Sequence, residues 1–192
     1  MWEKLAIKLW EKFLIKMDSY QNKVYRTKFG RFGKGSVIKK PILLTNPDRI
    51  FIGKRVFIRD HARIELVNSY RGKSFSPYLY IDDDVSVEQN LHLTCGENIH
   101  IERNVAVAAN VTITDIKHTY NDPIAPIKEQ NIITVPVKIG EGSVILNGAV
   151  VTPGTVLGKN CAVASNSVVI GQFPDFSFIG GVPAKIIKKF GP

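Results

Sequence analysis

Aliphatic residues return at every sixth position through the last part of the chain. These positions are Ile139, Ile145, Val151, Leu157, Val163 and Val169. A period of six matches neither an α-helix, at about 3.6 residues per turn, nor a half-buried strand, which alternates every second residue. The fourth residue after five of these aliphatics is small, namely Ser143, Ala149, Thr155, Cys161 and Ser167. The pattern predicts short strands joined by tight corners around one narrow interior, which is a parallel β-helix of hexapeptide repeats.

The same period occurs upstream in three shorter runs. Their aliphatic positions are Ile52, Ile58, Ile64, Ile81, Val87, Leu93, Ile101, Val107 and Ile113. The register slips between runs, because positions 93 and 101 are eight residues apart, positions 64 and 81 are seventeen apart, and positions 113 and 139 are twenty-six apart. We interpret the short slip as a corner insertion and the long ones as loops, at residues 66–80 and 114–136. Repeat proteins often place such insertions on a working face.

A chain of 192 residues is expected to form one main domain with a substantial core. Because a six-residue repeat builds a thin core that depends on stacking, segments that cover its ends are expected as well. We therefore divide the chain into three parts. They are a basic amphipathic N-terminal helical segment at residues 1–35, a β-helix domain at 36–175 and a C-terminal cap segment at 176–192.

The positive charge is concentrated near the N-terminus. Residues 1–40 hold eleven Lys and Arg against three acidic residues, 11 − 3 = +8, within a net charge of +9 for the chain. At helical spacing one broad apolar arc forms, flanked by lysines. Its members are Trp2, Leu5, Ala6, Leu9, Trp10, Phe13, Leu14 and Met17. Such a helix can cap the β-helix or make peripheral contact with an anionic membrane surface, and the sequence leaves both open. No aromatic-interleaved basic groove or known motif predicts a nucleic-acid partner.

Two cysteines far apart in the chain do not predict a disulfide framework. Cys161 occupies one of the small repeat positions and is expected to fill the core, while Cys95 sits at a slip between repeats. Lysines interrupt the apolar residues near the N-terminus, so no signal peptide is evident. We expect a cytoplasmic location, with the inner membrane face as the peripheral alternative.

A histidine lies near the start of the longest insertion. His118 follows the polar stretch that contains Asp115. A neutral imidazole is available near pH 7, so a histidine on a protruding loop is suited to act as a general base. The ordinary alternative is a surface or packing histidine, and Asp115 has an equally ordinary alternative as a turn residue that bonds its own backbone.

Three stretches make the chain resemble the hexapeptide-repeat acyltransferase superfamily, close to the galactoside, maltose and polysaccharide O-acetyltransferases. The first is the period itself, with Ile139-Gly140 and Leu157-Gly158 as repeat starts. The second is the run at residues 163–169, and the third is the closing motif at residues 180–188, Gly-Gly-Val-Pro-Ala-Lys-Ile-Ile-Lys. The similarity spans roughly residues 50–190.

The resemblance implies a left-handed β-helix that forms a homotrimer and takes acetyl-CoA as co-substrate in a groove between subunits. His118 matches the family's catalytic histidine, which implies direct transfer with His118 as general base and no acyl-enzyme. It also suggests Asn90, His92 and Asp115 as acceptor-binding residues. An asparagine at a β-helix corner is equally well explained by its tolerance of positive φ.

The resemblance extends to the cofactor. Asn147 matches a position on the pantetheine side, Ser165 and Gly171 match positions near the last coils, and Lys185 matches one near the nucleotide end. A lysine suits the phosphates of CoA as a point charge. The chain departs from the family at Val144-Ile145-Leu146, where many relatives have Trp-Ile-Gly. This departure changes a corner near which the cofactor is expected to lie.

These features together predict an acetyl-CoA-dependent O-acetyltransferase that acts on a sugar hydroxyl in cell-surface polysaccharide biosynthesis. One alternative is an N-acyltransferase on an amino-sugar nucleotide, since the same base can serve an amine. A catalytically inactive trimeric scaffold is another. A metal-dependent β-helix enzyme of the γ-class carbonic anhydrase type needs several histidines at one zinc, whereas the four histidines here show no close pair. We therefore expect no metal.

Overall fold

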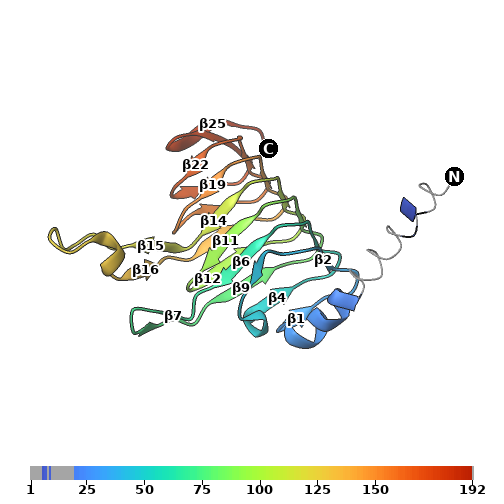
Figure 1. The fold of residues 1–192 in the computed structure, drawn as a ribbon. Helices are drawn as coiled ribbons and strands as arrows, with labels where there is room; N and C mark the ends of the chain where they lie inside the picture. Colours follow the sequence, from blue (N-terminus) through green and yellow to red (C-terminus); the bar gives the residue numbers. More distant parts are fainter. Residues whose placement is uncertain (1–5, 8, 10–19, 192) are drawn as a thin grey trace.

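The computed structural model describes residues 6, 7, 9 and 20–191, and its strands stack into a left-handed parallel β-helix with three faces (Figure 1). Sheet A contains β1 (Arg31–Phe32), β4 (Ile50–Ile52), β9 (Tyr78–Ile81), β12 (Asn98–Ile101), β17 (Val137–Ile139), β20 (Val156–Leu157) and β23 (Gln172–Phe173). Sheet B contains β2 (Val37–Ile38), β5 (Phe57–Ile58), β10 (Ser86–Val87), β13 (Ala106–Val107), β18 (Val144–Ile145), β21 (Ala162–Val163), β24 (Ser177–Gly181) and β25 (Ala184–Lys189). Sheet C contains β3 (Leu43–Leu44), β6 (Arg63–Leu66), β11 (His92–Cys95), β14 (Thr112–Thr114), β19 (Val150–Val151) and β22 (Val168–Val169). The predicted fold class is confirmed.

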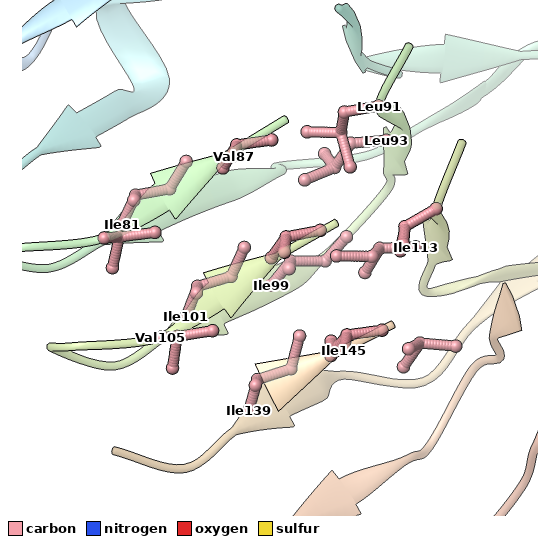
Figure 2. Close-up of a cluster of buried hydrophobic side chains, with 14 of the residues drawn as sticks. Ile81, Val87, Leu91, Leu93, Ile99, Ile101, Val105, Ile113, Ile139 and Ile145 are labelled. Atoms are coloured by element: carbon pink, nitrogen blue, oxygen red, sulfur yellow. The ribbon is translucent and has the colours of Figure 1, made fainter. Parts of the chain in front are cut away.

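The hexapeptide period corresponds to the buried core. The aliphatic positions that define it, from Ile52 to Val169, are all at most 1% exposed. The small positions four residues later, such as Ser143 and Cys161, are also buried. Figure 2 shows aliphatic side chains of successive coils pointing into the shared interior. Each coil contributes few atoms to this core, so the burial of every side chain depends on the coils above and below it.

Corners between sheets share one backbone feature, a residue in the left-handed conformation. Many of them contain one residue with positive φ, for example Asn104 at 58°, Asn110 at 61° and Gly148 at 70°. Glycine and asparagine tolerate this left-handed conformation better than other residues, which explains why they recur at these corners. The corner between sheets A and B, and that between B and C, repeat from coil to coil.

The corner between sheets C and A, called here the C–A corner, carries the insertions. One is the hairpin of β7 (Ser69–Tyr70) and β8 (Lys73–Ser74). The other is the longer hairpin of β15 (Ile116–His118) and β16 (Ile132–Thr134), whose loop contains the short 3-10 helix η2 (Ile127–Glu129). Both hairpins project from the same side of the stack (Figure 1). Both predicted loops, at residues 66–80 and 114–136, are therefore present as hairpins.

The N-terminal end of the stack is covered by a helix at residues 20–28. Asn22 lies on this helix and is buried, and its side-chain oxygen accepts a hydrogen bond from the N–H of Ile38 on β2 at 2.9 Å. Tyr25 on this helix packs against the rings of Phe29 and Phe32. This part of the predicted N-terminal segment therefore acts as a cap.

Most of the predicted apolar arc lies outside the described residues, namely Trp2, Leu5, Trp10, Phe13, Leu14 and Met17. The described members Ala6 and Leu9 are exposed. Strand pairing begins at β1, before the predicted boundary at residue 36, and β25 closes sheet B by antiparallel pairing with β24. Among the described residues, no helix is both long and apolar enough to cross a membrane.

Candidate functional site

The long hairpin presents His118 to solvent at the end of β15. His118 lies opposite Ile132 in the antiparallel pair and is exposed. Its ring meets the ring of Tyr70 edge to face, with centroids 5.8 Å apart and an interplanar angle of 80°. The Tyr70 hydroxyl donates to the Lys128 carbonyl at 3.2 Å. The short hairpin thus supports the long one beside the predicted general base.

Asp115 anchors the long hairpin rather than facing an acceptor. Its side chain is fully buried, and its carboxylate accepts backbone N–H groups from Gly96 at 2.6 Å, Glu97 at 2.9 Å and Asn98 at 2.9 Å. The Cys95 thiol donates weakly to the same carboxylate at 3.5 Å. A carboxylate with no exposed surface cannot reach an acceptor. The prediction that Asp115 binds the acceptor is therefore corrected. The Asp115 carboxylate and the N–H groups of Gly96, Glu97 and Asn98 form what we call the Asp115 socket, which holds the base of the hairpin.

The socket explains the eight-residue slip between repeats. The extra residues of that coil, around Gly96 and Glu97, turn their N–H groups toward Asp115. At Gly96 a Cβ atom would lie 2.6 Å from the Thr134 methyl, so only glycine lets β16 approach this closely. Thr134 also donates its hydroxyl to the Glu97 carboxylate at 2.8 Å. The small corner insertion and the large loop are therefore one interlocked unit.

Burial raises the pKa of both ionisable groups of the socket, Asp115 and Cys95. Loss of solvent raises the pKa of the Asp115 carboxyl, while the three N–H groups and the Cys95 thiol pull that pKa down. Burial also raises the pKa of the Cys95 thiol strongly, and the nearby Asp115 charge adds to the rise. A thiol with a raised pKa is a poor nucleophile. Cys95 is therefore a structural group of the corner.

Asn90 and His92 lie at the opposite edge of sheet C from the C–A corner. Asn90 occupies the corner between sheets B and C with φ of 62°, and its amide donates to the Asn110 side chain at 3.0 Å. His92 begins β11 and is exposed, in register with Arg63 and Thr112. His92 therefore points outward from the stack. Within the chain, sheet C separates Asn90 and His92 from the C–A corner that carries His118.

The predicted cofactor residues also lie at separate places in the chain. Asn147 and Ser165 are exposed at the corner between sheets B and C, on neighbouring coils, where the Asn166 N–H donates to the Asn147 carbonyl at 2.9 Å. Gly171 is at the C–A corner, and a Cβ there would meet no atom within 4 Å. Lys185 is exposed on β25. The fold of the chain therefore does not gather these four residues around His118.

The departure from the family pattern at residues 144–146 has a simple structural form. Ile145 enters the core with no exposed surface, as its repeat position requires. Leu146 begins the following corner and is 37% exposed. The corner still turns through Gly148, with φ of 70°. The β-helix is therefore continuous through this departure.

Neither the position of Tyr70 nor the socket at Gly96 and Glu97 was predicted from the sequence. The slip of two residues beyond the repeat was a signal for the socket, because a tight corner gains extra residues only where its backbone must follow another path. Nothing in the local sequence places Tyr70 against His118, since the two residues are forty-eight positions apart. Within residues 6, 7, 9 and 20–191, no group of three His, Cys, Asp or Glu side chains could hold a metal ion.

Comparison with known proteins agrees with this architecture. Residues 136–171 match the family model described as bacterial transferase hexapeptide, with six repeats. The O-acetyl transferase WbbJ of Escherichia coli, named for lipopolysaccharide biosynthesis, is 34% identical over 119 residues, covering 58% of this chain and 61% of WbbJ. The galactoside O-acetyltransferase of Escherichia coli is 25% identical, covering 74% of this chain and 80% of that protein. The predicted resemblance to hexapeptide-repeat acyltransferases is confirmed.

Solved structures share the fold. The N-acyltransferase AntD of Bacillus cereus, in complex with dTDP-4-amino-4,6-dideoxyglucose and coenzyme A, aligns with a TM-score of 0.75 and 22% identity over 90% of each chain. A hexapeptide-repeat acetyltransferase of Vibrio cholerae complexed with acetyl coenzyme A aligns with a TM-score of 0.61 and 20% identity, covering 91% of this chain and 78% of that one. Among the curated relatives, this chain spans 61% of WbbJ and 50% of an acetyltransferase of Mycobacterium tuberculosis.

Proposed function

We propose, from its hexapeptide repeats of the bacterial transferase type, that this chain is an acyltransferase that uses acetyl-CoA. Its acceptor in this proposal is a sugar hydroxyl of a cell-surface polysaccharide or its precursor. The observation that carries the proposal is His118, exposed at the root of the hairpin and packed against Tyr70. This position leaves the imidazole free to meet a substrate while its supporting strand is held in place.

In this proposal His118 acts as the general base and the acetyl group passes directly to the acceptor, without an acyl-enzyme. His118 takes the proton from the acceptor hydroxyl, and the resulting alkoxide attacks the thioester carbonyl of acetyl-CoA. Backbone N–H groups stabilise the negative oxygen of the tetrahedral intermediate. Collapse of this intermediate breaks the C–S bond, so the acetyl ester forms and the CoA thiolate leaves, accepting a proton. Cys95 and Cys161 take no part, because both are buried.

A second subunit completes the site in this proposal. Within one chain, Asn147 and Ser165 lie at the corner between sheets B and C and Lys185 lies on β25, whereas His118 projects from the C–A corner. Gly171 shares the C–A corner but lies on a later coil. A homotrimer with acetyl-CoA in the groove between neighbours would bring the hairpin of one subunit to the cofactor residues of the next. Exposed positions Asn147, Ser165 and Lys185 are available for such contacts. Asn90 and His92 remain the proposed acceptor contacts from the facing sheet.

The second candidate is N-acylation of an amino-sugar nucleotide. AntD, which shares this fold, is an N-acyltransferase bound to a dTDP-linked amino sugar, and PerB of Caulobacter crescentus, with a TM-score of 0.57, is complexed with CoA and GDP-perosamine. An amine that is already unprotonated needs less help from a base than a hydroxyl does. The two candidates therefore differ in how strongly the rate depends on His118.

The test is CoA release from acetyl-CoA with two acceptor panels, hydroxyl sugars and amino-sugar nucleotides. We expect turnover with the hydroxyl panel, and a loss of about 10²–10⁴-fold in His118→Ala with acetyl-CoA binding retained. Lys117→Ala, on the same strand and also exposed, is the matched control and should keep its turnover. Turnover confined to the amino-sugar nucleotides would favour the second candidate. Wild-type protein that releases CoA with neither panel would contradict the proposed function.

A further inference from the structure

A hollow lies between the two hairpins of the C–A corner. Its volume is about 490 Å³. It is bordered by Arg71 at the turn of the short hairpin and otherwise by the long hairpin. The lining residues on the long hairpin are Thr119, Asn121, Asp122, Ala125, Glu129, Gln130 and Asn131. Both hairpins extend away from the stack on one side, so the hollow belongs to the insertions and not to the repeats (Figure 1).

One wall of the hollow is held rigid by Gln130. Its amide group donates to the carbonyls of Asp122 at 2.8 Å and Ala125 at 3.0 Å, and its side-chain oxygen accepts the Asp122 N–H at 3.2 Å. The Asp122 carboxylate accepts the N–H groups of Ile124 and Ala125. These bonds shape the loop before any ligand arrives, which lowers the entropy cost of binding.

Other polar side chains around the hollow have hydrogen-bond donors and acceptors that are not used within the part of the chain that the structure describes. Among the described residues, the side chains of Arg71, Asn121, Glu129 and Asn131 make no hydrogen bond or ion pair. Together they offer guanidinium and amide donors as well as carboxylate and amide acceptors. Hydroxyl groups both donate and accept, so a surface with mixed donors and acceptors suits a molecule rich in hydroxyls.

The charge of the lining separates two kinds of acceptor. Arg71 contributes one positive charge, whereas Asp122 and Glu129 contribute two negative charges. A nucleoside diphosphate would bring further negative charge beside these carboxylates, and like charges repel. An uncharged sugar meets no such penalty. The lining therefore favours neutral hydroxyl groups over a diphosphate.

The hollow begins beside the proposed general base. Arg71 follows Tyr70, whose ring touches His118, and Thr119 follows His118 directly. An acceptor hydroxyl at His118 would thus have the next part of its molecule within reach of the hollow. We propose that this hollow is a subsite for an uncharged sugar unit of an oligosaccharide acceptor, adjacent to the unit that is acylated. The inference rests on the proposed function and narrows its acceptor to a glycan.

The experiment compares a methyl monosaccharide, its uncharged tri- and tetrasaccharides, and an amino-sugar nucleotide as acceptors. The variants are Arg71→Gly, which suits the local φ of 49°, and Glu129→Gln. Loss of a hydrogen bond from a charged group should raise the KM for the oligosaccharides about tenfold or more. The kcat, and the KM for the monosaccharide, should stay unchanged. Lys73→Ala is the matched control, because Lys73 lies on the same hairpin but outside the hollow.

The outcomes separate this inference from the proposed function. If wild type acylates the short and long glycans with equal KM, or if both variants keep the wild-type KM for oligosaccharides, the subsite is wrong and the transferase activity stands. A preference for the amino-sugar nucleotide that weakens in Arg71→Gly would assign the hollow to a phosphate and overturn the neutral-sugar inference. If no acceptor releases CoA, the proposed function itself fails. Saturation-transfer NMR with the tetrasaccharide checks binding without turnover, and its signal should weaken in Arg71→Gly.

Discussion

The corner between sheets B and C and the C–A corner are built from the same repeat and differ in almost every other respect. The first turns in the same way on successive coils, with positive φ at His61, Asn90, Asn110, Gly148 and Asn166. The second contains two hairpins and the Asp115 socket. The strict corner stacks the coils, and the interrupted corner presents His118 and the hollow. Where the repeat is interrupted, side chains such as His118 do not pack in the β-helix core and are exposed to solvent.

This division has a physical origin in how the backbone bonds are satisfied. At the strict corner, backbone N–H groups donate to carbonyls of the neighbouring coil, as from Gly148 to Ala109 at 3.1 Å. An insertion breaks that continuity and must supply its own partners. The long hairpin does so by pairing β15 with β16 and by placing the Asp115 carboxylate on three N–H groups. Buried backbone groups without partners would otherwise be costly.

The largest contrast should come from the core beneath the repeats. Ile139→Ala removes a fully buried side chain and should lower the free energy of unfolding by about 2–5 kcal/mol. Ile133→Ala, on the long hairpin and 38% exposed, should change it by less than about 0.5 kcal/mol, as surface substitutions usually do. Chemical denaturation measures both. Equal losses would show that the hairpin is as integral to the core as the repeats are.

The next effect should come from the socket. Asp115→Asn puts an amide, which donates on one side, where Gly96, Glu97 and Asn98 all donate, so at least one donor loses its acceptor. We expect a loss of about 1–3 kcal/mol in unfolding free energy and a larger proportional fall in kcat than in acetyl-CoA affinity. Asp48→Asn is the control, because Asp48 is exposed. If Asp115→Asn instead changed only the acceptor KM, the socket would not govern how His118 is placed.

A smaller effect is expected at the corner between sheets A and B, which repeats from coil to coil as the strict corner does. Asn104 has φ of 58°, and Asn104→Ala should cost about 1–2 kcal/mol because a Cβ without a local polar group disfavours this conformation. Asn104→Gly should stay close to wild type. Thermal melting of the pair checks the difference in backbone preference, since both variants remove the same side-chain amide. An equal fall for the two would mean that the amide and not the backbone matters there.

The smallest effect should be at the contact between hairpins. Tyr70→Phe removes the hydroxyl that donates to Lys128 but keeps the ring that meets His118. A net loss of about 0.5–1.5 kcal/mol is typical of one hydrogen bond, so we expect a change near the lower end and little change in kcat. Tyr70→Ala should lower kcat more, because the ring contact is lost as well. Indistinguishable kcat values for Tyr70→Ala and wild type would exclude a supporting role for the ring.

The order of aliphatic and small residues predicted a parallel β-helix of hexapeptide repeats, and the family resemblance supplied its left hand. The positions of Ile139, Ile145 and Val151 and their small partners at Ser143 and Ala149 carry the information locally, and burial confirms each of them. The long insertion was also predicted. The roles of His118, Asn90, Asn147, Ser165, Gly171 and Lys185 remain predictions. Periodicity works here because each repeat has the same neighbours above and below it.

Only the tertiary structure placed the residues that lie outside the period. The family resemblance suggested Asp115 as an acceptor contact, yet the fold buries it against Gly96 and Glu97 of the previous coil. Tyr70 and Arg71 come to the long hairpin from a different insertion. The repeat can be recognised from the spacing of residues close together in the sequence. The candidate site depends on which coils stack beneath which insertion, and that is decided by contacts between residues far apart in sequence.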